Sequence, residues 1–252
     1  MYSTPGQESS PPDAPVIETR GLSKAFRRAT AVDSVDLTVR PGRVYGLLGP
    51  NGAGKSTTLK LILGLIGPTT GEVRLFGQPW SRQGLSRIGA SIDGPSFYGH
   101  LSAKQNVMIH AHLLALPEAE AHSALAAVDL DPADRKKAKS FSTGMKGRLA
   151  LAIAMLGSPD LLILDEPQNG LDPEGIAALR TMMRRFTETG RTIVLSSHLL
   201  GEVASVADDI GLIAQGRLRY QGSLADLAPD GDLESAYFTL TSGSNEARAV
   251  TP

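Results

Sequence analysis

The chain has 252 residues, of which 41% are hydrophobic and 20% are charged, a composition typical of a soluble globular protein. Its formal net charge of -1 provides no overall positive field that would attract nucleic acid. The absence of cysteine excludes a disulfide framework, a cysteine zinc site and a thiol nucleophile.

The first 15 residues, MYSTPGQESSPPDAP, contain four prolines together with Ser, Gly and Gln, and this composition predicts a disordered N-terminal tail. They lack the basic and apolar regions of a secretory signal. No segment of the chain reaches the roughly 18 consecutive apolar residues that a membrane span requires. We therefore expect that the chain does not cross a membrane by itself.

Strand-like and helix-like segments follow in alternation. Residues 16–40 have the partial alternation of an antiparallel strand pair, and RVYGLLG (43–49) is typical of a buried central strand. A helix is expected over 55–65 and another strand over 71–77, where glycines bound the segment GEVRLFG.

From about residue 95 to 158 the pattern predicts helices without strands. Strands return at 160–167 and 191–198, with a connecting helix between them, and 209–222 reads as a hairpin with a Gln215-Gly216 turn. The predicted fold class is α/β, with a mostly parallel sheet, an N-terminal antiparallel β subdomain and a helical insert.

The stretch GPNGAGKST fits the phosphate-loop pattern G-x-x-x-x-G-K-[ST], between an apolar strand and a helix. The predicted phosphate-binding residues are Gly49, Pro50, Asn51, Gly52, Ala53, Gly54, Lys55, Ser56 and Thr57. Glycines let the backbone approach an anion, and successive N–H groups then form a positive concavity at the start of the helix. The Lys55 ammonium would reach the β- and γ-phosphates, and the Ser56 hydroxyl would ligate Mg²⁺.

A pair of carboxylates ends the predicted strand LLILDEP. Asp165 is placed to hold magnesium through water, and Glu166, one residue further on, to orient or deprotonate an attacking water. Together with the phosphate loop, this pair predicts hydrolysis of ATP or GTP.

The segment FSTGMKGRLALA (141–152) indicates which class of nucleotide-hydrolysing protein this chain resembles. It resembles the signature of the ATP-binding subunits of ABC transporters. In that family the signature of one subunit closes on the γ-phosphate of ATP held by the opposite subunit. The resemblance implies that Ser142, Thr143 and Gly144 contact nucleotide in a head-to-tail dimer that encloses two ATP molecules. An ordinary helix cap is the alternative for this segment.

Three further positions match the family in order. Phe26 stands where an aromatic residue stacks on adenine, and Asp172, within NGLDP, where the family places an aspartate at the dimer interface. His198 matches the switch histidine that contacts the γ-phosphate and positions the catalytic glutamate, which makes Lys55, Glu166 and His198 the expected catalytic residues. The resemblance covers roughly residues 16–226, between the N-terminal tail (1–15) and a C-terminal tail (227–252).

The sequence also departs from the family pattern. Asp93 stands where the family has a glutamine that links magnesium and water to the membrane partner. Exporters that resemble the bacitracin and lantibiotic-immunity group often carry a glutamate there, so Asp93 favours that group. Thr143 replaces a signature glycine, and Gly147 replaces a longer polar residue at a cost of about 1 kcal/mol against alanine in a helix. We expect an active ATPase, slowed by these changes.

The leading hypothesis is the ATPase subunit of a drug, antibiotic or lantibiotic-type peptide exporter, with ATP and Mg²⁺ as cofactors. The expected partners are a separate transmembrane permease and a second ATPase subunit, forming a homodimer on the cytoplasmic face of the membrane, without nucleic acid. Two alternatives remain: a soluble ABC ATPase that acts on ribosomes or DNA, and an importer ATPase. The basic cluster 135–139 could be a nucleic-acid patch, but is better explained as a solvated surface.

Overall fold

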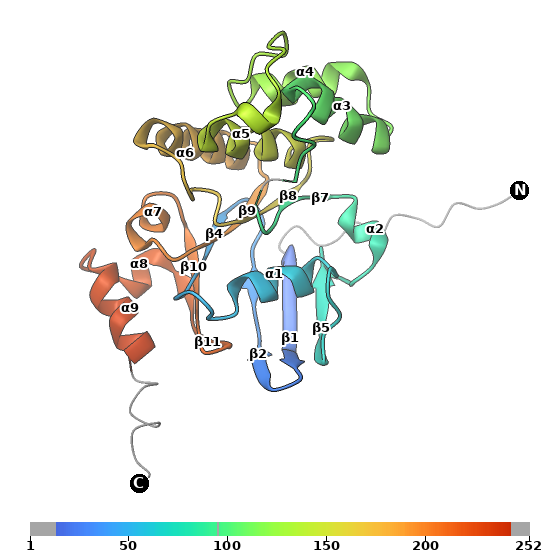
Figure 1. The fold of residues 1–252 in the computed structure, drawn as a ribbon. Coiled ribbons are helices and arrows are strands. Elements are labelled where there is room, and N and C mark those ends of the chain that lie inside the picture. The colour runs from blue at the N-terminus through green and yellow to red at the C-terminus, as the bar shows by residue number, and fades with distance from the viewer. Residues whose placement is uncertain (1–13, 95, 243–252) are drawn as a thin grey trace, which may run out of the picture.

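The computed structural model describes residues 14–94 and 96–242. The described residues form two sheets and several helices. Figure 1 shows a group of these helices beyond one end of the larger sheet. Most of the predicted tail 1–15 lies outside the described residues, as does the end of the predicted C-terminal tail, 243–252. Among the described residues, no helix combines the length and the apolar character that a membrane span requires.

The N-terminal sheet is antiparallel, as the sequence predicts. It consists of β1 (Ile17–Phe26), β2 (Ala29–Val35), β3 (Thr38–Val39), β5 (Thr70–Leu75) and β6 (Gln78–Pro79). Ile17 of β1 pairs with Val39 on one neighbour and with Leu75 on another. Ile17 and Thr19 are buried, because alternate residues of a strand face the same side of the sheet.

The larger sheet has six strands in the order β11-β10-β4-β9-β8-β7. Their bounds are β4 (Val44–Leu48), β7 (Ile88–Ser91), β8 (Leu161–Asp165), β9 (Thr192–Ser197), β10 (Asp209–Ala214) and β11 (Arg217–Ser223). Every pair from β10 to β7 is parallel, which confirms the predicted sheet. β11 returns antiparallel after Gln215 and Gly216, whose positive φ angles suit the predicted tight hairpin.

Both faces of the larger sheet are buried, so its strands are almost continuously apolar. Leu161 and Ile163 of β8 pack in the core shared with helix α1 (Lys55–Ile62) and the N-terminal sheet. Leu162 and Leu164 point the other way, into the core beneath the helical insert. The sheet therefore fixes the position of α1 relative to the helices on its other side.

The helical insert contains α3 (Ala103–Leu113), α4 (Glu118–Ala126), a 3₁₀ turn (Ala138–Ser140) and α5 (Thr143–Ala154). It confirms the helices predicted for 95–158. Ser102 and Gln105 form a capping box at the start of α3, in which each side chain accepts a hydrogen bond from the other's backbone N–H. The insert is thus a helical unit with a defined beginning.

Further helices complete the fold: α2 (Arg82–Leu85), α6 (Pro173–Glu188), α7 (Leu200–Ala204), α8 (Leu224–Leu227) and α9 (Leu233–Ser242). Helix α6 is the predicted connection between β8 and β9. It buries Leu179, Met182, Met183 and Phe186, at the spacing of one helical face. Helix α9 lies within the predicted C-terminal tail and contacts α7 and β11 (Figure 1).

Replacing Leu162 by alanine should lower the free energy of unfolding by about 2–5 kcal/mol, because the side chain is fully buried beneath the helical insert. Leu113→Ala is the matched control, since 76% of that leucine is exposed, and it should change stability by less than about 0.5 kcal/mol. Equilibrium unfolding in urea measures both. Equal losses would contradict the placement of these side chains.

Candidate functional site

The loop between β4 and α1 carries the predicted phosphate-binding residues. β4 is buried over its full length and ends at Leu48, and α1 begins at Lys55, as the sequence predicts. Gly54, immediately before α1, has φ +110°, and a Cβ there would lie 2.4 Å from the Ala31 carbonyl oxygen. Only glycine therefore fits this turn into the helix.

The rest of the loop is partly open to solvent. Pro50, Asn51 and Gly52 are exposed, whereas Gly49 and Ala53 are buried. The Ala53 amide donates to the Pro50 carbonyl at 3.1 Å, which closes a turn. The first N–H groups of α1, which include that of Thr57, have no carbonyl partner within the helix and can donate hydrogen bonds to an anion.

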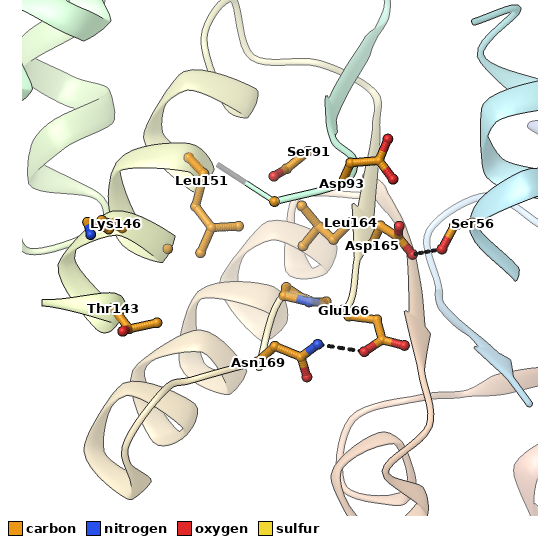
Figure 2. Close-up of a pocket in the computed structure, with 14 residues that line it drawn as sticks. Ser56, Ser91, Asp93, Thr143, Lys146, Leu151, Leu164, Asp165, Glu166 and Asn169 are labelled. Atoms are coloured by element: carbon orange, nitrogen blue, oxygen red, sulfur yellow. Dashed lines mark hydrogen bonds between the residues drawn. The ribbon is translucent and has the colours of Figure 1, made fainter. Parts of the chain in front are cut away.

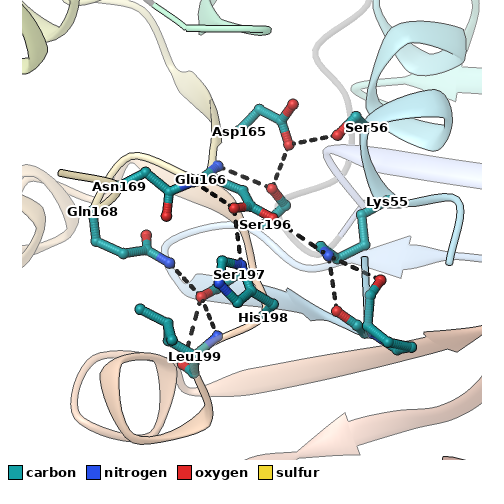
Figure 3. A network of polar contacts seen from close by, with 12 residues as sticks. Lys55, Ser56, Asp165, Glu166, Gln168, Asn169, Ser196, Ser197, His198 and Leu199 are labelled. Carbon is teal, nitrogen blue, oxygen red and sulfur yellow. Dashed lines mark hydrogen bonds and ion pairs between the residues drawn. The ribbon is translucent and has the colours of Figure 1, made fainter. Parts of the chain in front are cut away.

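Lys55 is 95% buried, with a relative exposure of 5%, although it carries a positive charge. Its Nζ donates to the carbonyl oxygens of Gly49 at 2.8 Å and Pro50 at 3.3 Å. The same Nζ lies 3.5 Å from Glu166 Oε1, as Figure 3 shows. Loop carbonyls and one carboxylate thus compensate a charge that burial would otherwise destabilise.

The predicted magnesium ligands meet one another directly. Ser56 Oγ donates to Asp165 Oδ1 at 3.1 Å, although the two residues are far apart in the sequence. Ser196 Oγ donates to the same carboxylate oxygen and accepts from the Glu166 amide at 3.0 Å (Figure 3). A hydroxyl and a carboxylate side by side are the oxygen donors that a hard cation such as Mg²⁺ prefers.

Three side chains among the described residues hold Glu166. Its Oε2 accepts from Asn169 Nδ2 at 2.6 Å and lies 2.9 Å from His198 Nδ1, while its Oε1 faces Lys55. Partial burial pushes the pKa of Glu166 upward. The hydrogen bonds of Asn169 and His198 and the charge of Lys55 outweigh burial and hold that pKa below its usual value. Glu166 is therefore a carboxylate at neutral pH, able to accept a proton.

A cleft of about 340 Å³ lies between these carboxylates and the helical insert. Ser56, Asp165 and Glu166 line one side, and Thr143 and Lys146 of α5 the other, as Figure 2 shows. The structure thus brings the signature-like segment and the predicted magnesium ligands of the same chain to one cleft.

Ser142 caps α5, with its hydroxyl accepting from the Met145 amide at 3.2 Å. The ordinary capping role is thus present in this chain, and Ser142 and Gly144 do not line the cleft. The side chain of Thr143 lies over Gly170, where an added Cβ would be 2.4 Å from Thr143 Cγ2. Thr143 therefore fits because residue 170 is a glycine.

Two predicted site residues lie apart from this cluster. Phe26 ends β1 and is 48% exposed, with Lys24 Nζ 5.2 Å from its ring centroid. Asp172 caps α6 by accepting from the Gly175 amide at 2.8 Å and is otherwise exposed. Both side chains lie at the surface, where a second molecule can reach them.

Asp93 lines the cleft, but in the part of the chain that the structure describes no hydrogen bond joins its carboxylate to the predicted magnesium ligands. Its Oδ2 forms an ion pair of 2.7 Å with Lys60 Nζ, on α1. Asp93 also has a positive φ of 58°, a conformation in which aspartate, like asparagine and histidine, is enriched among the residues other than glycine. Asp93, at the position expected to hold the family's glutamine, is thus joined by an ion pair to α1, the helix that follows the phosphate loop.

Two contributors to the site, Asn169 and Ser196, were not predicted from the sequence. Ser196 was identifiable in principle, since parallel pairing places it opposite Asp165 in β8 and β9. Asn169 follows Glu166 by three residues, inside the segment NGLDP that was singled out only for Asp172. Its contact with Glu166 depends on the turn that joins them, which no spacing rule specifies.

Comparisons with known proteins agree on one family. A family model described as "ABC transporter" matches residues 32–169, more than half of the chain. The lantibiotic transport ATP-binding protein SrtF of Streptococcus pyogenes is 42% identical over 212 residues, covering 82% of this chain and 93% of the relative. The bacitracin transport ATP-binding protein BcrA of Bacillus licheniformis is 40% identical over 208 residues, covering 81% and 68%.

Solved structures share the fold. One, of an ATP-binding subunit of an ABC transporter, has a TM-score of 0.80 at 29% identity and covers 89% of this chain and 99% of its own. Another, a dimeric ATP-binding cassette in a post-hydrolysis state with ADP and Pi, has a TM-score of 0.74. At 22% identity, covering 82% and 98%, it establishes a likeness of fold alone.

Lys55→Ala should lower the rate of ATP hydrolysis by at least about 100-fold, because it removes the buried charge that would meet the phosphates. Lys136→Ala, an exposed lysine on the helical insert, is the matched control and should hydrolyse ATP at the unmodified rate. Phosphate release under saturating ATP measures both. Vigorous hydrolysis by Lys55→Ala would refute the assignment of the phosphate loop.

Proposed function

This chain is an ATPase subunit that belongs to the ABC transporter family, and we propose that it powers an exporter of antibiotics or lantibiotic-type peptides. The observation that carries the proposal is the meeting of Lys55, Ser56, Asp165 and Glu166 at the phosphate loop. The export of such peptides is supported by the names of the relatives, which describe lantibiotic and bacitracin transport.

The proposed reaction begins when the phosphates of ATP enter the loop between β4 and α1. The Lys55 ammonium then leaves its ion pair with Glu166 and binds the β- and γ-phosphates. The adenine stacks on the exposed ring of Phe26. Water attacks the γ-phosphorus, the bond to the bridging oxygen of ADP breaks, and a proton of the water passes to Glu166. The products are ADP and inorganic phosphate, with His198 near the γ-phosphate.

Magnesium would be held by Ser56 and Asp165. A binding site for Mg²⁺ usually combines one or two carboxylates with waters and phosphate oxygens, and the paired hydroxyl and carboxylate fit that requirement. The ion would neutralise charge that develops on the phosphates. Ser196 orients Asp165 from the neighbouring strand.

Subunits of this family dimerise and act with permeases. In the proposed dimer, Ser142, Thr143, Gly144 and Asp172 of one copy contact the ATP and interface of the other. The surface position of Asp172 supports this assignment, and a homodimer is the simplest form. The permease would hold the pair at the inner face of the membrane, with Asp93 linking the site to it.

In domain terms, we assign the ATPase domain to residues 16–226, with the helical insert at about 95–158. Residues 1–15 and 227–252 then flank it as N- and C-terminal segments. The location of every predicted catalytic residue between Lys55 and His198 supports these limits.

Glu166→Gln should bind ATP and accumulate as a closed dimer, since the amide keeps the shape of the side chain but cannot accept the proton. Size-exclusion chromatography with light scattering, with and without saturating ATP and Mg²⁺, measures the mass. Glu188→Gln, exposed at the end of α6, is the control and should not trap a dimer. A Glu166→Gln protein that stays monomeric would contradict this role.

The transporter assignment is tested by affinity capture of the tagged chain from detergent-solubilised native membranes, followed by mass spectrometry. We expect a stoichiometric protein with several membrane spans. Recovery with ribosomal proteins or nucleic acid, and without a membrane protein, would refute the exporter proposal. It would leave the ATPase chemistry standing.

A further inference from the structure

The carboxylate of Glu166, the proposed proton acceptor, contacts Asn169, which lies three residues further along the same turn. Asn169 Nδ2 donates to Glu166 Oε2 (Figure 2). At 2.6 Å this contact is shorter than those of His198 and Lys55 with the same carboxylate. Glu166 and Asn169 both line the cleft beside the magnesium ligands. Hydrogen bonds to a charged acceptor are stronger than those between neutral groups, so this contact restricts the rotation of the carboxylate.

The turn that carries Asn169 is fixed at both ends. The Asn169 amide donates to the Glu166 carbonyl at 3.1 Å, and the Leu171 amide donates to the Gln168 carbonyl at 3.1 Å. Gln168 is 5% exposed, and its side chain donates to Ser197 Oγ on β9. Beyond Asn169, Gly170 packs beneath Thr143 of α5. The asparagine therefore projects from a braced segment and not from a free loop.

We propose that Asn169 is a positioning residue, which with His198 holds Glu166 Oε2 so that Oε1 is the oxygen that takes the proton from water. This inference rests on the proposed ATPase mechanism. Within residues 14–94 and 96–242, Asn169 and His198 both contact Oε2, whereas Lys55 contacts Oε1. When Lys55 turns to the phosphates, Oε1 loses its partner and faces them, while Oε2 stays bound.

The segment 166–171 connects Glu166 Oε2 with α5, the helix that begins in the signature-like sequence. Thr143 rests on Gly170, and Leu171 Cδ2 lies 3.4 Å from the position of a Cβ on Gly147. Movement of α5 would therefore displace the turn that ends in Asn169. Closure of α5 onto a second copy's nucleotide would in this way reach Glu166 of its own chain.

The test uses the full chain and compares Asn169→Ala, Asn169→Asp and Asn169→Gln. The first deletes the amide and the second replaces it, at the same size, by a carboxylate that cannot donate. Because a positioning group acts on the chemical step, both should lower kcat for ATP hydrolysis by about tenfold. The KM and the equilibrium Kd for ATP should stay within about twofold. Asn169→Gln keeps an amide donor and should recover at least half of the lost rate.

Gln83→Ala, an exposed amide on α2, is the matched control and should leave kcat unchanged. If both Asn169→Ala and Asn169→Asp keep the full kcat while Glu166→Gln is inactive, the positioning role is refuted and the proposed ATPase mechanism survives. A parallel loss of kcat and of ATP affinity, without rescue by Asn169→Gln, would also refute it. If Glu166→Gln hydrolyses ATP as fast as the unmodified chain, the proposed mechanism itself fails.

Discussion

The buried positive charge of Lys55 is the constraint on which the candidate site depends. An ammonium group removed from water must be compensated, and here two loop carbonyls and the Glu166 carboxylate do so. A phosphate group would offer the same compensation with more negative charge. The structure therefore holds the Lys55 ammonium and the Glu166 carboxylate together, and in the proposed mechanism a phosphate group replaces Glu166 as the partner of Lys55 and frees the carboxylate.

The parallel sheet brings these groups to one edge. The loop after β4, the carboxylates at the end of β8 and the histidine after β9 all follow neighbouring strands at their carboxyl ends. This is the edge at which open α/β sheets bind their ligands. The cores on both faces of the sheet hold that edge rigid, with α1 on one face and the helical insert on the other.

The departures from the family pattern have structural counterparts. Thr143 occupies space left by Gly170, whereas a Cβ on Gly147 would lie 3.4 Å from Leu171 Cδ2, an ordinary contact distance, so no steric conflict explains the glycine at position 147. Asp93, in place of the family's glutamine, pairs with Lys60 and so joins the loop before the helical insert to α1.

The sequence by itself determined the elements whose signals are local. The phosphate loop, the strand ending in Asp165 and Glu166, the helical insert and the Gln215-Gly216 hairpin each lie within one short segment, where spacing and residue type suffice. The elements β7 and α7 were not predicted, because their sequences IGAS and LGEVA lack the continuous apolar run that marks the similarly short strands β4 and β8. Only the tertiary structure decided which groups touch Glu166 and Asp165. Ser196 reaches Asp165 through the register of two strands, and Asn169 reaches Glu166 through the shape of one turn. The first contact depends on how two distant strands pack and the second on the conformation of a turn, and the residue pattern of a segment specifies neither.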